Sequence, residues 1–232
     1  MKHAFTLIEL IIIIILIGIL SLTVSPFFQR DTLIPATNQV LDHIRYTQQL
    51  ALNQDMFVPY ADFSAYPPGI QHTKDARQWF KKWWRIQFHG NSSYSIYSDH
   101  PTTTIGNFSF GAQADVNDLV ARDPETGLFL FGNLVNGFPD SQRNVLLDLQ
   151  DEYGVTVNVQ GCLNNSSQIL FDNLGRPHCS KGDPDLSLNP YDHMTLTGQF
   201  ISVVLTDGND IQTICITPLT GYTYITQNPV CP

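Results

Sequence analysis

The clearest pattern in the chain is a predominantly apolar run from Leu10 to Val24, preceded by Leu7, Ile8 and a single carboxylate at Glu9. The run has about the length that a helix of roughly 20 residues needs to cross a bilayer. A charge at depth in a bilayer costs roughly 2.5–3.5 kcal/mol or more. The pattern therefore predicts a transmembrane helix over residues 5–26, in which Glu9 needs a partner.

The pattern changes to an amphipathic one in residues 27–55. Val40, Ile44, Thr47 and Ala51 recur at helical spacing on one face, with polar residues opposite. This spacing predicts a helix that begins after Pro35, runs to about Asn53 and packs on a globular domain.

Beyond residue 56 the apolar positions alternate, which predicts strands separated by turn residues. A short helix is expected at Lys74 to Lys82. The expected strands are 84–88 and 94–98 around a turn at 90–93, then 127–131, 145–149, 155–160, 167–171, 200–206, 211–217 and 222–225. A helix followed by antiparallel strands predicts an α+β fold, with residues 56–232 as one β-rich domain.

Composition supports an exported domain. The net charge is −9, with Lys+Arg 12 against Asp+Glu 21, and such a surface repels nucleic acid in general. The four cysteines, Cys162, Cys179, Cys215 and Cys231, allow three pairings. We expect the sequential pairing, in an oxidising compartment. None of the cysteines has CxxC spacing, so no metal is expected.

The N-terminal string resembles the type IV prepilins. Met1 to Ala4 form a short basic leader, and Phe5-Thr6-Leu7-Ile8-Glu9 follows it directly. The resemblance implies cleavage after Ala4, where the family usually has Gly, and N-methylation of Phe5. It also implies that the new Phe5 amine pairs with Glu9 during assembly, and that Gly18 and Pro26 are kink positions in the helix.

Two later strings resemble minor pseudopilins of the GspH/FimT type. They are Gln168 to Arg176, which reads QILFDNLGR, and Ile214 to Gly221, which reads ICITPLTG. The resemblance implies a pilin-like fold, a long N-terminal helix packed on antiparallel β-sheets. The organisation would be a leader at 1–4, a membrane or filament-core half-helix at 5–26, an amphipathic half at 27–55 and a periplasmic domain at 56–232.

The implied function is mechanical. A minor pilin or pseudopilin assembles through its N-terminal helix into a type II secretion pseudopilus or a type IV pilus, often at the tip. The implied partners are the prepilin peptidase, other pilins of the filament and the inner membrane. No cofactor, small-molecule substrate or catalytic residue is expected.

Two alternatives stay open. Some relatives in that group bind DNA through a Gly-Arg-x-Arg-like element, but the corresponding residues here are Gly221-Tyr222-Thr223-Tyr224, which carry no cation for phosphate. Five basic residues between Lys74 and Arg85 alternate with aromatic ones, which suits single-stranded nucleic acid, an acidic surface or simply a core segment. A membrane-anchored periplasmic protein is the remaining alternative.

Enzymatic chemistry has little support in the sequence. The histidines show no metal-ligand spacing, and neither a Gly-x-Ser-x-Gly elbow nor a phosphate-binding glycine loop is present. The carboxylates of 207–210 and 183–185 do not complete a calcium loop and fit turns better. We therefore expect no enzyme and no metal site.

Overall fold

The computed structural model describes residues 7–24, 32–54, 82–98, 101–104, 107–110, 119–132, 140–162, 166–180 and 199–232. The chain divides into two compact units, Met1–Asp31 and Thr32–Pro232.

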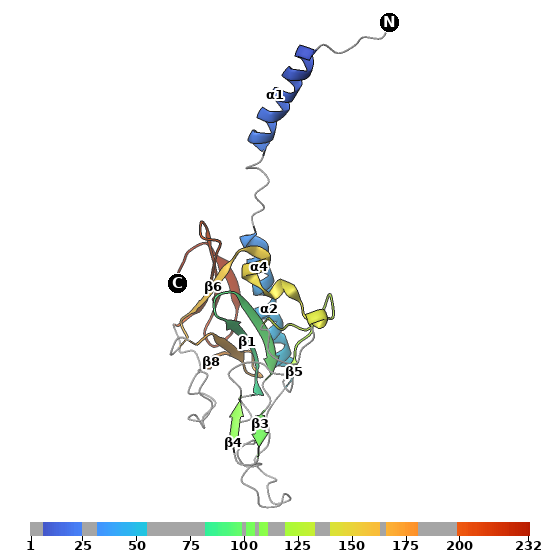
Figure 1. Cartoon of the computed structure of the whole chain (residues 1–232). Coiled ribbons are helices and arrows are strands. Elements are labelled where there is room, and N and C mark those ends of the chain that lie inside the picture. The colour runs from blue at the N-terminus through green and yellow to red at the C-terminus, as the bar shows by residue number, and fades with distance from the viewer. Residues whose placement is uncertain are drawn as a thin grey trace, which may run out of the picture. The chain divides into compact units, whose positions relative to one another are not determined.

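The first unit contains helix α1, Leu7–Val24 (Figure 1). Its residues are apolar apart from a few small polar ones and Glu9 in the first turn. Among the described residues, no helix meets the combination of length and apolar character needed to cross a membrane. Ala4, Phe5 and Pro26 lie outside the described residues.

Helix α2, Leu33–Asn53, begins earlier than the sequence predicts. Pro35 lies inside its first turn rather than before it, because the first backbone N–H groups of a helix have no partner within the helix and proline lacks one. The predicted apolar face is confirmed: Val40, Ile44, Thr47 and Ala51 are all buried.

The described residues of the second unit form three antiparallel sheets. The five-stranded sheet has the order β5 (Leu119–Val120), β2 (Ser93–Ser98), β1 (Trp84–His89), β7 (Gln168–Phe171) and β8 (Pro177–Ser180). The four-stranded sheet has the order β11 (Thr223–Thr226), β10 (Ile211–Ile216), β9 (Ile201–Thr206) and β6 (Thr156–Gln160). A separate pair joins β3 (Pro101–Thr104) to β4 (Asn107–Phe110).

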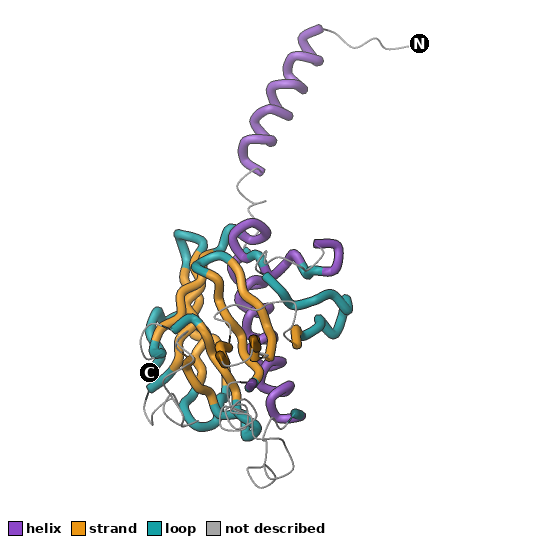
Figure 2. Tube along the Cα trace, turned by 60° about the horizontal axis from the view of Figure 1, so that its bottom comes forward, coloured by secondary structure: helices purple, strands orange, loops and turns teal. Residues whose placement is uncertain are grey.

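Helix α2 joins the two larger sheets into one domain. It packs on β1 of one sheet and on β10 and β11 of the other (Figure 2). Its buried side chains belong to one hydrophobic core with residues of both sheets, including Ile86, Ile169, Val203 and Ile214. The coarse prediction, an α+β fold with a helix on antiparallel sheets, is confirmed.

Both predicted hairpins are present. Strands β1 and β2 pair from Trp84 with Ser98 to His89 with Ser93. Strands β9 and β10 pair around residues 207–210, where the Asp207 carboxylate accepts hydrogen bonds from the backbone N–H groups of Asn209 and Asp210. This carboxylate therefore closes a turn, as the sequence indicated.

Two predicted strands are wrong. Residues 127–131 form only isolated bridges at Phe129 and Phe131, and residues 145–149 form the short helix η5 (Val145–Leu147) and the start of α4 (Leu149–Tyr153). The Asn144 side chain accepts from Leu146 N, and the Asp148 side chain accepts from Asp151 N. These local bonds favour helical turns over a strand.

Four strands were missed in the sequence: β3, β4, β5 and β8. Strand β8 follows directly on the turn after β7 and contains a proline, which argues against a strand unless it lies at an edge. It is indeed the last strand of its sheet. The expected helix at 74–82 lies, except for Lys82, outside the described residues.

The disulfides follow the expected sequential pairing. Cys162 is bonded to Cys179, and Cys215 is bonded to Cys231. The first ties the segment after β6 to β8, and so joins the two sheets. The second ties β10 to the C-terminal segment.

Gly221 offers a test of how closely two turns approach. It has φ +65°, and an alanine Cβ there would overlap the carbonyl oxygen of Gly175, whereas Gly154, with φ +67°, has open space around the same position. The backbone penalty, about 1–2 kcal/mol, is shared by both sites. We expect Gly221→Ala to lower the free energy of unfolding by at least about 2 kcal/mol more than Gly154→Ala. Only at position 221 would the added methyl group be crowded by neighbouring atoms.

Chemical denaturation of the full-length protein in non-ionic detergent, followed by tryptophan fluorescence, measures both losses. Equal losses for the two variants would show that the turns can separate without cost.

Candidate functional site

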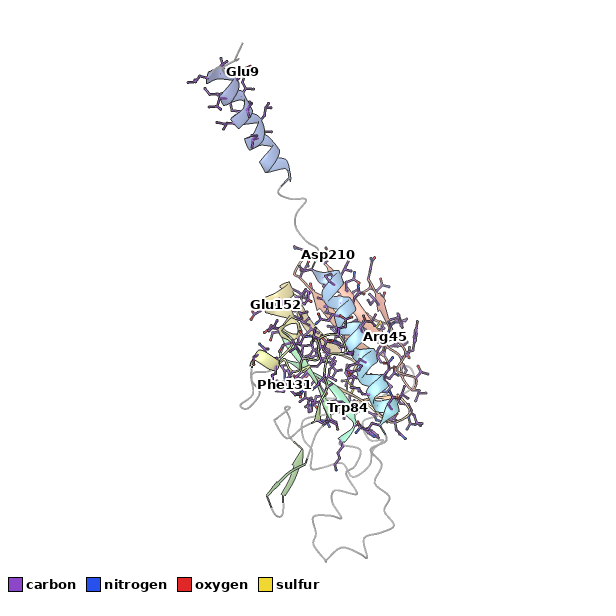
Figure 3. The ribbon with its side chains drawn as sticks, turned by 90° about the vertical axis from the view of Figure 1, so that its right-hand side faces the viewer. Glu9, Arg45, Trp84, Phe131, Glu152 and Asp210 are labelled. Carbon is purple, nitrogen blue, oxygen red and sulfur yellow. A yellow bond between two sulfur atoms is a disulfide. The ribbon has the colours of Figure 1, made fainter. Side chains whose placement is uncertain are left out.

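The residues expected to direct assembly lie on α1, as far as they are described. Glu9 is in the first turn, and Figure 3 shows it on the helix surface. Over residues 7–19 of α1, the large apolar side chains are exposed in the single chain, from 77% for Leu7 to 41% for Ile13. A Cβ at Gly18 would meet nothing within 4 Å. Apart from Glu9, these residues are apolar on every side of the helix. A helix of this kind is normally buried, either in a membrane or against other helices.

The two strings that carry the subtype resemblance meet at one side chain of α2. Gln48 Nε2 donates to the carbonyl oxygen of Gly175 at 2.8 Å and to that of Thr220 at 3.1 Å. The turns after β7 and β10 are therefore held together by both amide protons of one glutamine. The sequence marked each turn separately, but only the fold shows that they touch.

Asp172, in the first of those strings, is a buried carboxylate at the centre of a polar cluster. Its oxygens accept from Arg176 Nε at 2.6 Å, from His178 Nε2 at 3.1 Å, and from the backbone N–H groups of Leu174 and Arg176. Burial by itself raises the pKa of Asp172, but these hydrogen bonds more than offset burial and hold it below 3.8. The cluster closes the β7–β8 turn.

Two regions were considered for DNA: residues 221–224, and the basic and aromatic segment, of which only residues 82–85 are described. Tyr222 and Tyr224 stack on each other with ring centroids 5.9 Å apart. In the basic and aromatic segment, Trp83, Trp84 and Arg85 are only 3–4% exposed. Side chains buried to this extent belong to the core and cannot stack on a base. Residues 74–81 lie outside the described residues.

A polar network that the sequence did not reveal lies beneath α2. Tyr153 OH donates to Gln39 Oε1 at 2.7 Å, and Gln39 Nε2 donates to Tyr94 OH at 2.8 Å and to Leu146 O at 2.7 Å. Tyr94 is fully buried and its hydroxyl lies 2.7 Å from His43 Nδ1. The Tyr94 hydroxyl thus accepts from Gln39 and shares a second hydrogen bond with His43 Nδ1, whose direction is set by the tautomer of the histidine.

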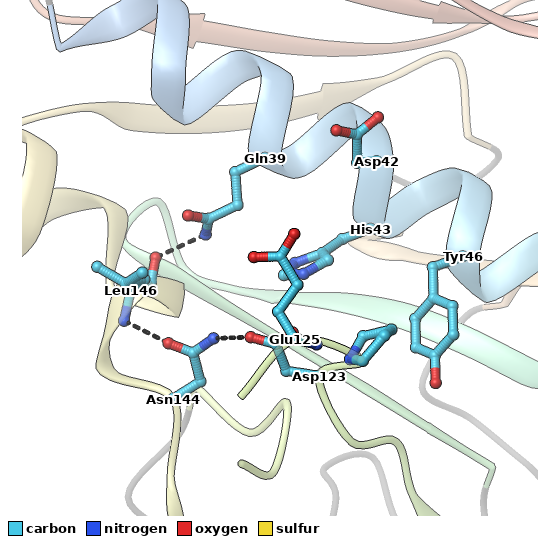
Figure 4. A pocket seen from close by; sticks show the side chains of 9 residues that line it. Gln39, Asp42, His43, Tyr46, Asp123, Glu125, Asn144 and Leu146 are labelled. Carbon is cyan, nitrogen blue, oxygen red and sulfur yellow. Dashed lines mark hydrogen bonds between the residues drawn. The ribbon is translucent and has the colours of Figure 1, made fainter. Parts of the chain in front are cut away.

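Above this network the surface is hollowed into a recess of about 320 Å³ (Figure 4). One wall is a face of α2, and the opposite wall is the turn after β5 together with the segment before η5. The lining residues are Gln39, Asp42, His43, Tyr46, Asp123, Pro124, Glu125, Asn144 and Leu146. The spacing of residues 39, 43 and 46 predicts that they share one face of a helix. It does not predict that residues 123–125 and 144–146 lie opposite that face.

Hydrogen bonds fix the Asp123 carboxylate in this recess. Its oxygens accept from Glu125 N and Thr126 Oγ1, both at 2.9 Å, and from Asn144 Nδ2 at 2.8 Å. Burial raises the pKa of Asp123, but the bonds from Glu125 and Thr126 and the nearby His43 hold it below its ordinary value. Burial lowers the pKa of His43 from 6.5, against the opposite influence of Asp123 and Asp42. At pH 7 the recess therefore holds the ionised carboxylate of Asp123 beside a neutral imidazole.

No metal site is visible in the described part of the chain. None of its His, Cys, Asp and Glu side chains form a group of three or more that could hold a metal ion. Residues 183–185 lie outside the description.

Comparison with known proteins gives no relative. No family model, no curated protein and no solved structure matches the chain.

Asp172 provides a stability test for the turn cluster. We expect Asp172→Asn to lower the free energy of unfolding at pH 7 by about 3 kcal/mol, because it removes a buried charge on which Arg176 and His178 converge. The pKa of Asp172 is depressed in the folded state, so its stabilisation is present above pH 3.8 and is lost as the pH falls through the folded pKa.

The difference between the wild type and the variant should therefore shrink below pH 3.8. Denaturation at pH 7 and at pH 3 measures it, with Asp210→Asn, an exposed acid, as the control for charge alone. A variant as stable as the wild type at pH 7 would contradict the assignment.

Proposed function

We propose that this protein is a minor pilin or pseudopilin, a non-enzymatic subunit that joins a type II secretion pseudopilus or a type IV pilus through its N-terminal helix. On this proposal Ala4 ends a leader that the prepilin peptidase removes, and Phe5 becomes the methylated N-terminus. The globular unit lies in the periplasm or at the filament tip, and the other pilins are its partners.

One observation carries the proposal: α1 is an apolar helix with an acid in its first turn. An ordinary anchor gains nothing from Glu9, because a carboxylate at depth costs roughly 2.5–3.5 kcal/mol. A filament subunit has a use for it. The amine of Phe5, its own or a neighbour's, then pairs with Glu9 in a low-dielectric core and sets the subunit register.

The globular unit agrees with this function. Helix α2 packs on antiparallel sheets as the pilin resemblance implies, and two disulfides close the β-rich part. Disulfides persist in the bacterial periplasm and at the cell surface, where a filament subunit would carry its C-terminal domain. The DNA-uptake alternative has no comparable support, since the aromatic residues described in the basic segment are buried.

Removing the α1 carboxylate tests the assembly role. We expect Glu9→Ala and Glu9→Leu to insert in the membrane at wild-type level but to enter filaments at least about tenfold less, because the Phe5 amine is left unpaired. Immunoblots of the membrane fraction and of sheared filaments measure both quantities.

Glu152→Gln is the matched control, since it removes an exposed acid from the globular unit and should assemble normally. Wild-type incorporation of both Glu9 variants would rule out the pairing.

Processing gives a separate test. Mass spectrometry of the membrane-extracted protein should find a chain that begins with N-methylated Phe5, and a strain without the prepilin peptidase should retain the chain from Met1. A chain that begins at Met1 in the wild-type strain would leave a membrane-anchored periplasmic protein as the better description.

A further inference from the structure

The recess between α2 and the turn after β5 has the chemistry of a binding site that the filament role does not use. It is large for a single ion, since about 320 Å³ accommodates the end of a long side chain. Its walls come from segments far apart in the sequence, at residues 39–46, 123–125 and 144–146. Figure 4 shows Gln39 and His43 of α2 on one side and Glu125, Asp123 and Asn144 on the other.

Its ionisable side chains carry negative charge or none. Asp42 and Glu125 are exposed at the sides of the recess, and Asp123 is half-buried and fixed by its hydrogen bonds. The His43 ring is hydrogen-bonded to Tyr94 OH through Nδ1, and burial lowers its pKa from 6.5, so at pH 7 it adds no positive charge that would repel a cation.

Arg122 and Arg45, which adjoin lining residues in the sequence, do not neutralise these carboxylates. Arg122 lies with its guanidinium carbon 3.8 Å from the Phe129 ring centroid and donates to Gly127 O. Arg45 reaches Asp42 only at 3.8 Å, with both side chains largely in solvent, where such a pair is worth about 0–1 kcal/mol. In the part of the chain that the structure describes, Glu125 makes no ion pair.

The other lining groups suit an organic cation. The Tyr46 ring and the Pro124 and Leu146 side chains are apolar surface for an alkyl stem, and an aromatic face also attracts a cation. Carboxylates on two walls, of which Asp123 is fixed by its hydrogen bonds, suit the several N–H donors of a guanidinium or an ammonium group.

We propose that the recess binds an alkyl-guanidinium or alkyl-ammonium group, either the end of an arginine or lysine side chain or a free polyamine. Asp123 is the fixed acceptor at its base. Asp42 and Glu125 add negative charge from opposite walls of the recess. Tyr46 and Leu146 pack against the alkyl stem of the bound group. The proposal is independent of the filament function.

Calorimetric titration of the full-length protein in non-ionic detergent tests it with two probes. Agmatine represents a free polyamine and N-acetyl-arginine amide represents a side chain on a polypeptide, and N-acetyl-citrulline amide is the neutral control of the same shape. We expect saturable binding of at least one cationic probe, weakened by sodium chloride, and none of the citrulline compound. The cationic probe that binds more tightly identifies the source of the group.

Asp42 and Glu125 are exposed, so replacing their carboxylates should leave the fold intact. The double variant Asp42→Asn, Glu125→Gln should weaken binding by about tenfold or more, and Asp210→Asn, outside the recess, should change it by less than about twofold. Melting temperatures of all variants confirm folding, so the result does not depend on Asp123→Asn, which loses structural hydrogen bonds.

Three results would overturn the proposal. They are equal binding of the citrulline and arginine compounds, unchanged affinity in the double variant, and saturable binding of Ca²⁺ or Mg²⁺ with no binding of either cationic probe.

Discussion

The globular unit depends on the burial of one face of α2 against two sheets at once. Val40 and Ile44 are fully buried and belong to a core that contains residues of both sheets. Burying each such side chain contributes about 1.5–3 kcal/mol relative to exposure. Helix α2 contacts strands of both sheets, so it is the element on which both are packed.

Polar contacts along the same helix fix the orientation of the packed elements, which hydrophobic burial alone does not determine. Burial is not directional, whereas hydrogen bonds are, and α2 makes directional bonds at both ends. Thr32 Oγ1 donates to Tyr153 O at the start of the helix, and Gln48 bonds the two turns near its end. Between them, Gln39 and His43 engage the buried hydroxyl of Tyr94. The helix therefore sets both the position of the sheets and the geometry of the recess.

The proposed roles of the two helices follow from the same chemistry in different surroundings. On α1 a carboxylate lies among apolar side chains and is costly without a partner cation. Near α2 the carboxylates of Asp42, Asp123 and Glu125 lie at a water-exposed surface, where Asp123 is already fixed by its own turn. The first arrangement suits subunit pairing in a filament core, and the second suits reversible capture of a cation.

The sequence by itself determined the features that depend on neighbouring residues. Periodicity gave the buried face of α2, and alternation with turn residues gave the β1–β2 and β9–β10 hairpins. It failed where local capping competed with apolar content, at 145–149, and where an edge strand carried proline, at β8. The contact between the turns at Gly175 and Gly221, the buried cluster of Asp172 and the recess were decided only by the tertiary structure. Each brings together groups from separate segments, and the spacing of residues within one segment carries no information about what packs opposite it.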